Sequence, residues 1–442
     1  MVRTAKGREN GEPRVVDLKQ ATRLVQETIQ DPSVVGEETA ARNKEILEAA
    51  MAGVPGFRSR AVEAVKAVLE LHGVEVEGMD LDAASYEIYK YAWGLDVIED
   101  LYRDPEVNEI RVNAPDRVYV LRRLKNERTD VRFRDDEHVL KIITRITMHD
   151  RGVSLNRSSP TLESVRKDGT RVTATCPPVT EHVTLVLRKH IPRALTPEEM
   201  IASGVFDEKV WEVLRALVRG RANILVCGGV GSGKTTLVRT LYRETHENAR
   251  CVALESDREL FLAKNFPERD IVEMEEHPET GRTLASLFRT VLRYSPTFIV
   301  VGEYRSAEEA KEAIEACRRG HDGSMATAHF NSPEEAVVGT ARLYVESGAG
   351  VRPEAAAQAV ASAYNVVVQM FGDPTRGVLK LERIAEVAPD GDRGAAINDL
   401  VRWTPRGEDY LDGDWKIVGS PGRRLAERLA RYGSSLPGWL KC

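Results

Sequence analysis

The spacing of apolar residues in the first quarter of the chain predicts helices. Between residues 17 and 101 apolar positions recur every three or four residues. Two stripes show this spacing: Ala61, Val62, Val65, Val68 and Leu69, and then Tyr86, Ile88, Tyr89, Ala92 and Trp93. Glycines and a Pro-Gly pair interrupt the pattern. We therefore expect a bundle of three or four helices over residues 17–101. Residues 1–16 are polar and contain Gly and Pro, so we expect them to be disordered.

Near residue 101 the pattern of apolar and polar residues changes to the two-residue alternation that is typical of strands. Residues 107–113 and 117–121 alternate apolar and polar side chains, and Ala114-Pro115-Asp116 between them predicts a hairpin. Similar patterns predict one helix and two further strands, at residues 139–148, 170–175 and 183–188. Residues 102–191 therefore form an expected α+β domain. Prolines and a glycine break the pattern over residues 192–205, which we expect to be a linker.

Strand-like and helix-like segments alternate from residue 206 to residue 390, which predicts an α/β domain. The expected strands are short apolar runs, at residues 222–227, 251–255, 298–301, 325–328 and 366–370. Residues 379–387 are expected to add an edge strand. The tail, residues 391–442, is mixed, with two strands near 399–403 and 415–418 and a basic amphipathic helix at 423–432.

One segment of this α/β domain fits the phosphate-binding pattern G-x-x-x-x-G-K-[ST]. An apolar strand precedes the segment and helical spacing follows it. Glycines let the backbone wrap a phosphate, and the helix N-terminus favours an anion. We expect Lys234 to reach the β- and γ-phosphates of ATP and the Thr235 hydroxyl to ligate Mg²⁺. The expected nucleotide-binding residues are Gly228, Gly229, Val230, Gly231, Ser232, Gly233, Lys234, Thr235 and Thr236.

Three further residues at predicted strand ends are candidates for catalysis. Glu303 follows an apolar strand, where an acid beside a phosphate loop orients or deprotonates the attacking water. The Asp that usually precedes this acid is replaced by Gly302. Glu255 also ends a strand and is either a second acid near Mg²⁺ or a solvated terminus. His329 ends another strand, and its pattern alone favours an ordinary core histidine.

Composition narrows the class of protein. The chain has 442 residues, a formal net charge of −6 and 42% hydrophobic residues, which indicates a globular protein of two or three domains. The acidic balance gives no general attraction to nucleic acid. The five cysteines form no C-x-x-C pair, so we expect reduced thiols in a cytoplasmic protein. We see neither an apolar signal segment nor a membrane-spanning run.

Taken together, these motifs resemble the type II/IV secretion and pilus-assembly ATPase superfamily, and within it the CpaF branch of Tad-type pilus motors. The family carries four boxes in a fixed order: a phosphate loop, an acidic box ending in Glu-Leu, a Gly-Glu-x-Arg motif and a His box. Here they are Gly228–Thr235, Glu255–Leu260, Gly302–Arg305 and Gly320–His329. Upstream, residues 104–113, Ser159-Pro160, residues 168–172 and residues 187–189 are similar to the family's N-terminal domain.

The resemblance implies a hexameric ring whose subunits each join an N-terminal domain to a RecA-like motor domain. It implies that Arg171 and Arg188 contact nucleotide phosphates across the cleft between these domains. Glu303, Glu255 and His329 take catalytic roles in this picture, with Glu255 near Mg²⁺, directly or through water. The implied partner is a polytopic inner-membrane platform protein of a pilus or secretion machine. The chain itself would be cytoplasmic and peripheral at the inner face of the membrane.

Two other classes stay open at this point. A RecA-like core also drives nucleic-acid motors, although we find no basic and aromatic binding stripe here. A scaffold that binds ATP without turnover is the third reading, and the retention of Lys234, Thr235 and Glu303 argues against it. Ser256 replaces a second acid in the acidic box, and the four-cysteine insert of many relatives is absent.

Overall fold

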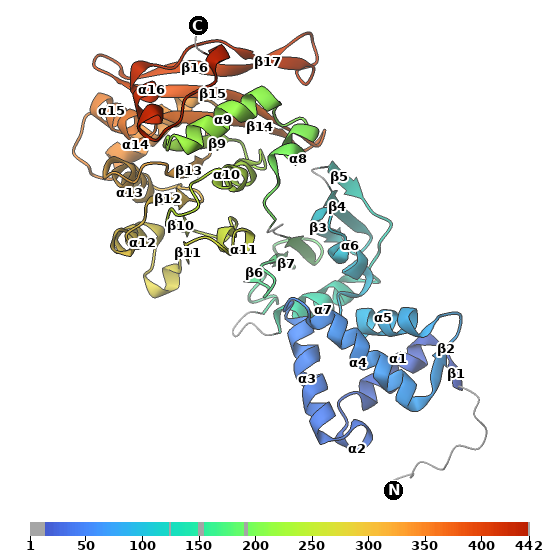
Figure 1. The fold of residues 1–442 in the computed structure, drawn as a ribbon. Helices are drawn as coiled ribbons and strands as arrows, with labels where there is room; N and C mark the ends of the chain where they lie inside the picture. The colour runs from blue at the N-terminus through green and yellow to red at the C-terminus, as the bar shows by residue number, and fades with distance from the viewer. Residues whose placement is uncertain (1–13, 123–124, 149–153, 190–192, 441–442) are drawn as a thin grey trace. The chain divides into compact units, whose positions relative to one another are not determined.

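A computed structural model describes residues 14–122, 125–148, 154–189 and 193–440 (Figure 1). The chain divides into two compact units with a boundary between residues 191 and 192. Residues 1–13 of the expected disordered segment, Pro192 of the expected linker and the last two residues of the tail lie outside the described residues.

The first unit begins with helices that share one apolar core. Asp17, Asp31 and Asp80 cap three of them by accepting a backbone N–H. The helices are α1 (Leu18–Thr28), α2 (Pro32–Val35), α3 (Glu37–Met51), α4 (Phe57–His72) and α5 (Leu81–Ala92). A parallel pair of short strands, β1 (Arg14–Val16) and β2 (Val74–Val76), joins them. Residues 14–16 are thus ordered in a strand, and the expectation of disorder was wrong for them.

The rest of the first unit is a six-stranded antiparallel sheet with helix α7 (Asp136–Thr147) on its apolar face. Short helices η1 (Asp96–Ile98) and α6 (Glu99–Arg103) lead into it. The strand order is β5-β4-β3-β8-β7-β6. The strands are β3 (Val107–Ala114), β4 (Arg117–Arg122), β5 (Lys125–Arg128), β6 (Thr161–Val165), β7 (Arg171–Thr175) and β8 (Thr184–Arg188). The predicted hairpin is confirmed as the antiparallel pair of β3 and β4.

The second unit is built on a nine-stranded sheet in the order β11-β10-β12-β13-β9-β14-β15-β16-β17. The first six strands in this order pair in parallel, and the last three are antiparallel. The strands are β9 (Ile224–Gly228), β10 (Cys251–Glu255), β11 (Ile271–Glu275), β12 (Phe298–Val301), β13 (Met325–Ala328), β14 (Val366–Asp373), β15 (Val378–Asp390), β16 (Gly394–Pro405) and β17 (Gly413–Ile417).

Helices cover both faces of this sheet, so its inner strands are buried throughout. On one face lie α9 (Glu208–Arg219), α10 (Lys234–Tyr242) and α16 (Arg423–Arg431). On the other lie α12 (Leu284–Val291), α13 (Ala307–Arg318), α14 (Pro333–Glu346) and α15 (Pro353–Ala363). Alternate residues of β9 point to opposite cores, as Ile224 and Leu225 show. The short elements are α8 (Pro197–Ala202), α11 (Leu262–Asn265), η2 (Pro278–Thr280), η3 (Leu292–Tyr294) and η4 (Gly438–Leu440).

The tail is part of the sheet of the second unit. β15 was expected at an edge, but it lies between β14 and β16, so that expectation was wrong. The two strands predicted in the tail, now β16 and β17, continue the sheet beyond it, and in Figure 1 they form its orange-to-red end. Helix α8 occupies part of the segment that was expected to be a linker, and its Met200 is fully buried.

Candidate active site

The phosphate loop lies at the carboxyl end of the apolar strand β9 and leads into helix α10. All five residues of β9 are buried, and α10 begins at Lys234. Gly231 and Gly233 have φ values of 72° and 85°, in the left-handed region that glycine adopts without strain. Val230 is 77% exposed, so the tip of the loop faces solvent. The loop therefore has the backbone conformation that a phosphate cradle requires.

The phosphate loop packs closely against strands β14 and β15. A Cβ on Gly372 of β14 would stand 2.7 Å from the Cα of Ser232, and one on Gly233 would stand 3.0 Å from Leu379 of β15. Both distances are shorter than ordinary contacts allow, so these glycines let the loop and the two strands pack closely. The path of the loop thus depends on strands that come more than 130 residues later in the chain.

Backbone carbonyl groups of the phosphate loop hold the Lys234 side chain inside the loop. Its Nζ donates to the carbonyl oxygens of Gly228 and Gly229, at 3.0 Å each, and lies 3.1 Å from Nδ1 of His329. Burial lowers the pKa of Lys234, and the nearby Glu303 carboxylate opposes that shift. The buried Ser232 hydroxyl has no hydrogen-bond partner within the described ranges. A buried cation and an unsatisfied hydroxyl in a glycine loop fit a phosphate group.

Glu303 follows β12, and two basic side chains contact its carboxylate. Arg305 Nε donates to Oε1 at 2.8 Å, and His329 Nε2 lies 3.1 Å from the same oxygen. Burial raises the pKa of Glu303, but the hydrogen bond from Arg305 and the charge of His329 outweigh burial and leave it below its ordinary value. Glu303 is therefore a carboxylate at neutral pH. His329 touches both Lys234 and Glu303, so the structure brings these three predicted residues together.

Glu255 ends β10 and lies in a very different environment. It is 3% exposed, and its Oε1 accepts the backbone N–H groups of Glu259 at 2.9 Å and Leu260 at 2.8 Å. Burial raises its pKa to about 7, while these two hydrogen bonds act in the opposite direction. A Cβ on Gly302 would stand 2.8 Å from Glu255 Cγ, which explains why a glycine replaces the usual acid before Glu303.

A small oxygen-lined cavity joins these groups to Thr235. It has a volume of about 30 Å³, and its lining residues are Thr235, Glu255, Ser256, Asp257, Glu259, Gly302, Glu303 and Arg305. Thr235 Oγ1 donates to Glu259 Oε2 at 3.3 Å. Hydroxyl and carboxylate oxygens are the ligands that Mg²⁺ prefers. Within the part of the chain that the structure describes, no three His, Cys, Asp or Glu side chains form a metal site by themselves. The arrangement fits an ion that also takes ligands from phosphate and water.

Glu259 and Arg305 are site residues that the sequence analysis did not single out. Glu259 closes the cavity beside Thr235, and Arg305 holds the Glu303 carboxylate. Both belong to boxes that were recognised, so the signal was present, but only the folded geometry shows which side chain points into the site.

Arg171 and Arg188 lie together at one end of a strand pair. Arg171 begins β7, Arg188 ends β8, and the two residues are directly opposite in the antiparallel register. Arg188 is exposed and Arg171 is half-buried. Both belong to the first unit, whereas the phosphate loop belongs to the second. Their contact with nucleotide stays a prediction.

A phosphate loop and two acids at the carboxyl edge of a mostly parallel sheet define a P-loop nucleotide-binding protein. Residues 92–372 match the family model described as "Type II/IV secretion system protein". The chain belongs to this family, and it is an ATPase with a RecA-like motor domain, a smaller α+β N-terminal domain and an N-terminal helical bundle.

Known relatives cover between about half and 70% of the chain. A Mycobacterium tuberculosis protein, whose name assigns it provisionally to conjugal transfer, is 30% identical over 341 residues, which cover 70% of this chain and 93% of the relative. The type IV secretion system protein VirB11 of Brucella suis is 30% identical over 262 residues, which cover 52% of this chain and 71% of VirB11.

Solved structures of two ATPases are also similar. The Brucella suis VirB11 ATPase in complex with sulphate is 26% identical, with a TM-score of 0.35, and the match covers 66% of this chain and 95% of that one. The Legionella pneumophila ATPase DotB is 18% identical, with a TM-score of 0.47, covering 69% and 79%. Across the described ranges, no helix combines the length and apolar character needed to cross a bilayer.

Proposed function

We propose that this chain is the ATPase motor of a pilus-assembly or protein-secretion machine and that it works as a homo-hexameric ring. The contact of His329 with both Lys234 and Glu303 carries this proposal, because it links the phosphate-binding cation to the catalytic acid. The four-box order supports the superfamily, and the absence of the four-cysteine insert together with the helical N-terminal extension favours the CpaF branch of Tad-type motors. A cytoplasmic position at the inner face of the membrane, beside a polytopic platform protein, agrees with this function.

Each residue of the site has a role in this proposal. Bound Mg²⁺-ATP supplies the phosphoanhydride that is cleaved and a divalent charge that neutralises the phosphates. Lys234 and the loop amides, from Gly228 to Thr236, bind phosphate oxygens. Thr235 ligates the ion, with Glu255 beside it or linked through a water. Glu303 orients the attacking water and accepts its proton. When a phosphate binds Lys234, the contact between His329 and Lys234 breaks. Because His329 also contacts Glu303, this change couples occupancy of the loop to Glu303.

The N-terminal domain completes the site in this proposal. Arg171 and Arg188 are aimed from strand ends, and a guanidinium can stabilise the charge that develops on the γ-phosphate. Closure of the two units around nucleotide would form that contact, and hydrolysis would remove it. Domain boundaries at residues 101 and 191 go with this proposal.

Ring assembly is the test of the motor. Mass photometry with a non-hydrolysable ATP analogue should show a species of about six subunits. Lys234→Ala is the matched control, because it removes the loop cation, and should lose the analogue-dependent assembly. A strict monomer at micromolar concentration would contradict the proposal. ATP turnover that single-stranded DNA stimulates and high salt abolishes would support the nucleic-acid motor instead.

A further inference from the structure

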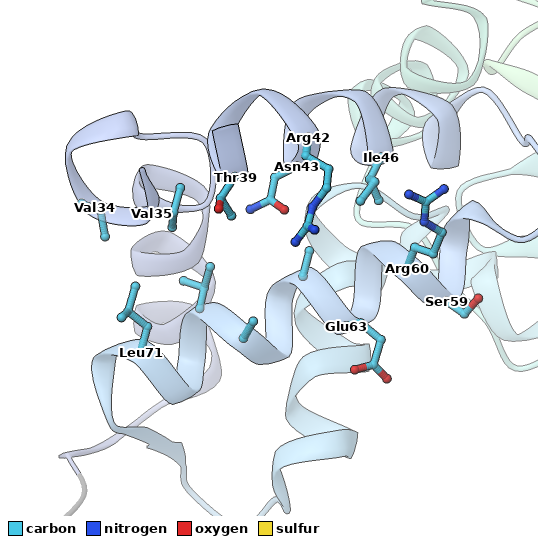
Figure 2. A pocket seen from close by; sticks show the side chains of 13 residues that line it. Val34, Val35, Thr39, Arg42, Asn43, Ile46, Ser59, Arg60, Glu63 and Leu71 are labelled. Atoms are coloured by element: carbon cyan, nitrogen blue, oxygen red, sulfur yellow. The ribbon is translucent and has the colours of Figure 1, made fainter. Parts of the chain in front are cut away.

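The helical part of the first unit carries a groove that no part of the proposed motor cycle uses. It runs between α3 and α4, is closed at one end by α2, and has a volume of about 530 Å³ (Figure 2). Its floor is apolar. The lining residues with apolar side chains are Val34, Val35, Ile46, Ala64, Ala67, Val68 and Leu71. Leu71, at one end of the groove, is 52% exposed.

Two helical stripes face each other across this groove. Thr39, Arg42, Asn43 and Ile46 line it from α3 at the spacing of one helix face. From α4 the lining residues run from Ser59 to Leu71 at the same spacing. Ala64 and Ala67 lie in the middle of the α4 stripe, and their small side chains leave the groove open. Arg60 and Leu71 are eleven residues apart, so the groove is about 16 Å long, which matches three turns of a helix.

The groove is also electrically asymmetric. Arg42 and Arg60 lie along one part of it, while Val34, Val35 and Leu71 form the opposite end (Figure 2). Neither arginine forms a salt bridge with a carboxylate in the described part of the chain; Arg60 lies 4.5 Å from the centre of the Phe57 ring. Glu63 points away from both guanidinium groups in Figure 2, and its charge acts on Lys66 instead. The groove thus presents an apolar floor and two cations that carboxylates can pair with.

We propose that this groove binds an amphipathic α-helix of another protein, one that places large apolar side chains over Ala64 and Ala67 and carboxylates beside Arg42 and Arg60. A helix in a groove is a common docking mode, and its apolar side chains recur every three or four residues. The two arginines set the orientation of the helix, because its acidic end must lie at their end of the groove. The first 13 residues of this chain do not fit, since they hold three basic and two acidic residues and almost no large apolar ones.

The test uses the full-length protein and three labelled peptides of about four helical turns. One peptide carries leucines on one face and glutamates at one end, the second has lysines in place of those glutamates, and the third is a scramble of the first. Fluorescence anisotropy should show the acidic peptide binding at micromolar concentration and about tenfold more tightly than the other two. Equal binding of all three peptides, or no binding of the acidic one, would overturn the proposal.

Substitutions in the groove test whether the acidic peptide binds there. Ala67→Phe fills the groove from an exposed position and should weaken binding of the acidic peptide by about tenfold. Arg42→Glu with Arg60→Glu should reverse the preference toward the lysine peptide, whereas Lys44→Glu, on the same helix but outside the groove, should not. ATP turnover should be unchanged in every variant, so the result is independent of the proposed motor function. Unchanged peptide binding in both groove variants would overturn the proposal, as would a change in subunit number caused by Ala67→Phe, because a second copy would then be the occupant.

Discussion

At the scale of single residues, two glutamates of the site are held in opposite protonation environments. Basic neighbours lower the pKa of Glu303, although burial acts against them, while burial raises that of Glu255 to about 7. Glu303 is thus ready to accept a hydrogen bond from water at any physiological pH. Glu255 is better matched to proton transfer near neutrality, which makes it the alternative base.

Glu303→Gln should leave ATP binding intact and reduce turnover by about 10²-fold or more, because an amide accepts no proton from water. Steady-state ATPase and nucleotide titration measure the two effects. Glu308→Gln is the matched control, since Glu308 is an exposed acid in the first turn of α13. Turnover near the wild-type rate in Glu303→Gln would assign the base to Glu255.

Gly302→Ala should destabilise the second unit by about 1–3 kcal/mol, because the added Cβ collides with Glu255 in a packed interior. Urea unfolding checks the loss of stability, and ATPase assays should show a parallel loss of activity. Gly407→Ala meets nothing within 4 Å and serves as the control. Equal stability of the two variants would mean that Glu255 can move aside freely.

Lys189 gives the first unit a predictable pH dependence. Its Nζ donates to the carbonyl oxygens of Tyr102 and Asp104, at 2.9 and 2.6 Å, and burial lowers its pKa to about 8. An unfolded lysine titrates near about 10.4. Between these values the unfolded chain binds more protons than the folded one, so the contribution of Lys189 to stability rises with pH and is lost as pH falls through about 8.

Lys189→Met should therefore remove part of the rise in stability between about pH 8 and pH 10. Urea unfolding at several pH values measures the slope. Lys167→Met, at an exposed position, should keep the wild-type slope. A slope that is the same in all three proteins would show that Lys189 titrates normally in the folded state.

At the scale of elements, the β7–β8 pair places two arginines side by side. Arg171 and Arg188 are directly opposite each other, and like charges at such positions are destabilising. The contact with nucleotide phosphates proposed for both cations would account for the pairing.

Arg188→Gln should thus leave stability unchanged or raise it by about 0.5 kcal/mol, while it reduces turnover by about 10³-fold if Arg188 reaches the γ-phosphate. Thermal unfolding and steady-state ATPase separate the two effects. Arg117→Gln, on an exposed strand end of the same sheet, is the control. More than about half of wild-type turnover in Arg188→Gln would reduce the N-terminal domain to a docking platform.

The elements that the sequence predicted well are those with a strong local pattern. The strand before the phosphate loop is a continuous apolar run, and the hairpin of β3 and β4 has clear alternation and a proline turn. β11 was missed because its half-buried edge sequence alternates with glutamates and looks like a loop. The interior position of β15 could not be predicted, because it depends on pairing with β16, which local sequence does not reveal.

At the scale of the whole molecule, the site was predictable as a list of boxes but not as a set of contacts. The boxes named Glu303 and His329, yet the contact of His329 with Lys234 joins residues 95 positions apart. The groove in the helical part of the first unit could not be predicted from the sequence either. Its groove depends on the angle between α3 and α4 and on two alanines that look like ordinary helix formers in sequence.

The close packing of Gly372 against Ser232 links the stability of the second unit's sheet to nucleotide binding. The phosphate loop packs directly against β14 and β15, and β15 pairs with β16 of the tail, so the loop and the tail strands belong to one packed sheet. Proteolysis or local unfolding of the tail strands is therefore expected to disturb the packing of the loop. Loss of the tail strands should therefore weaken ATP binding.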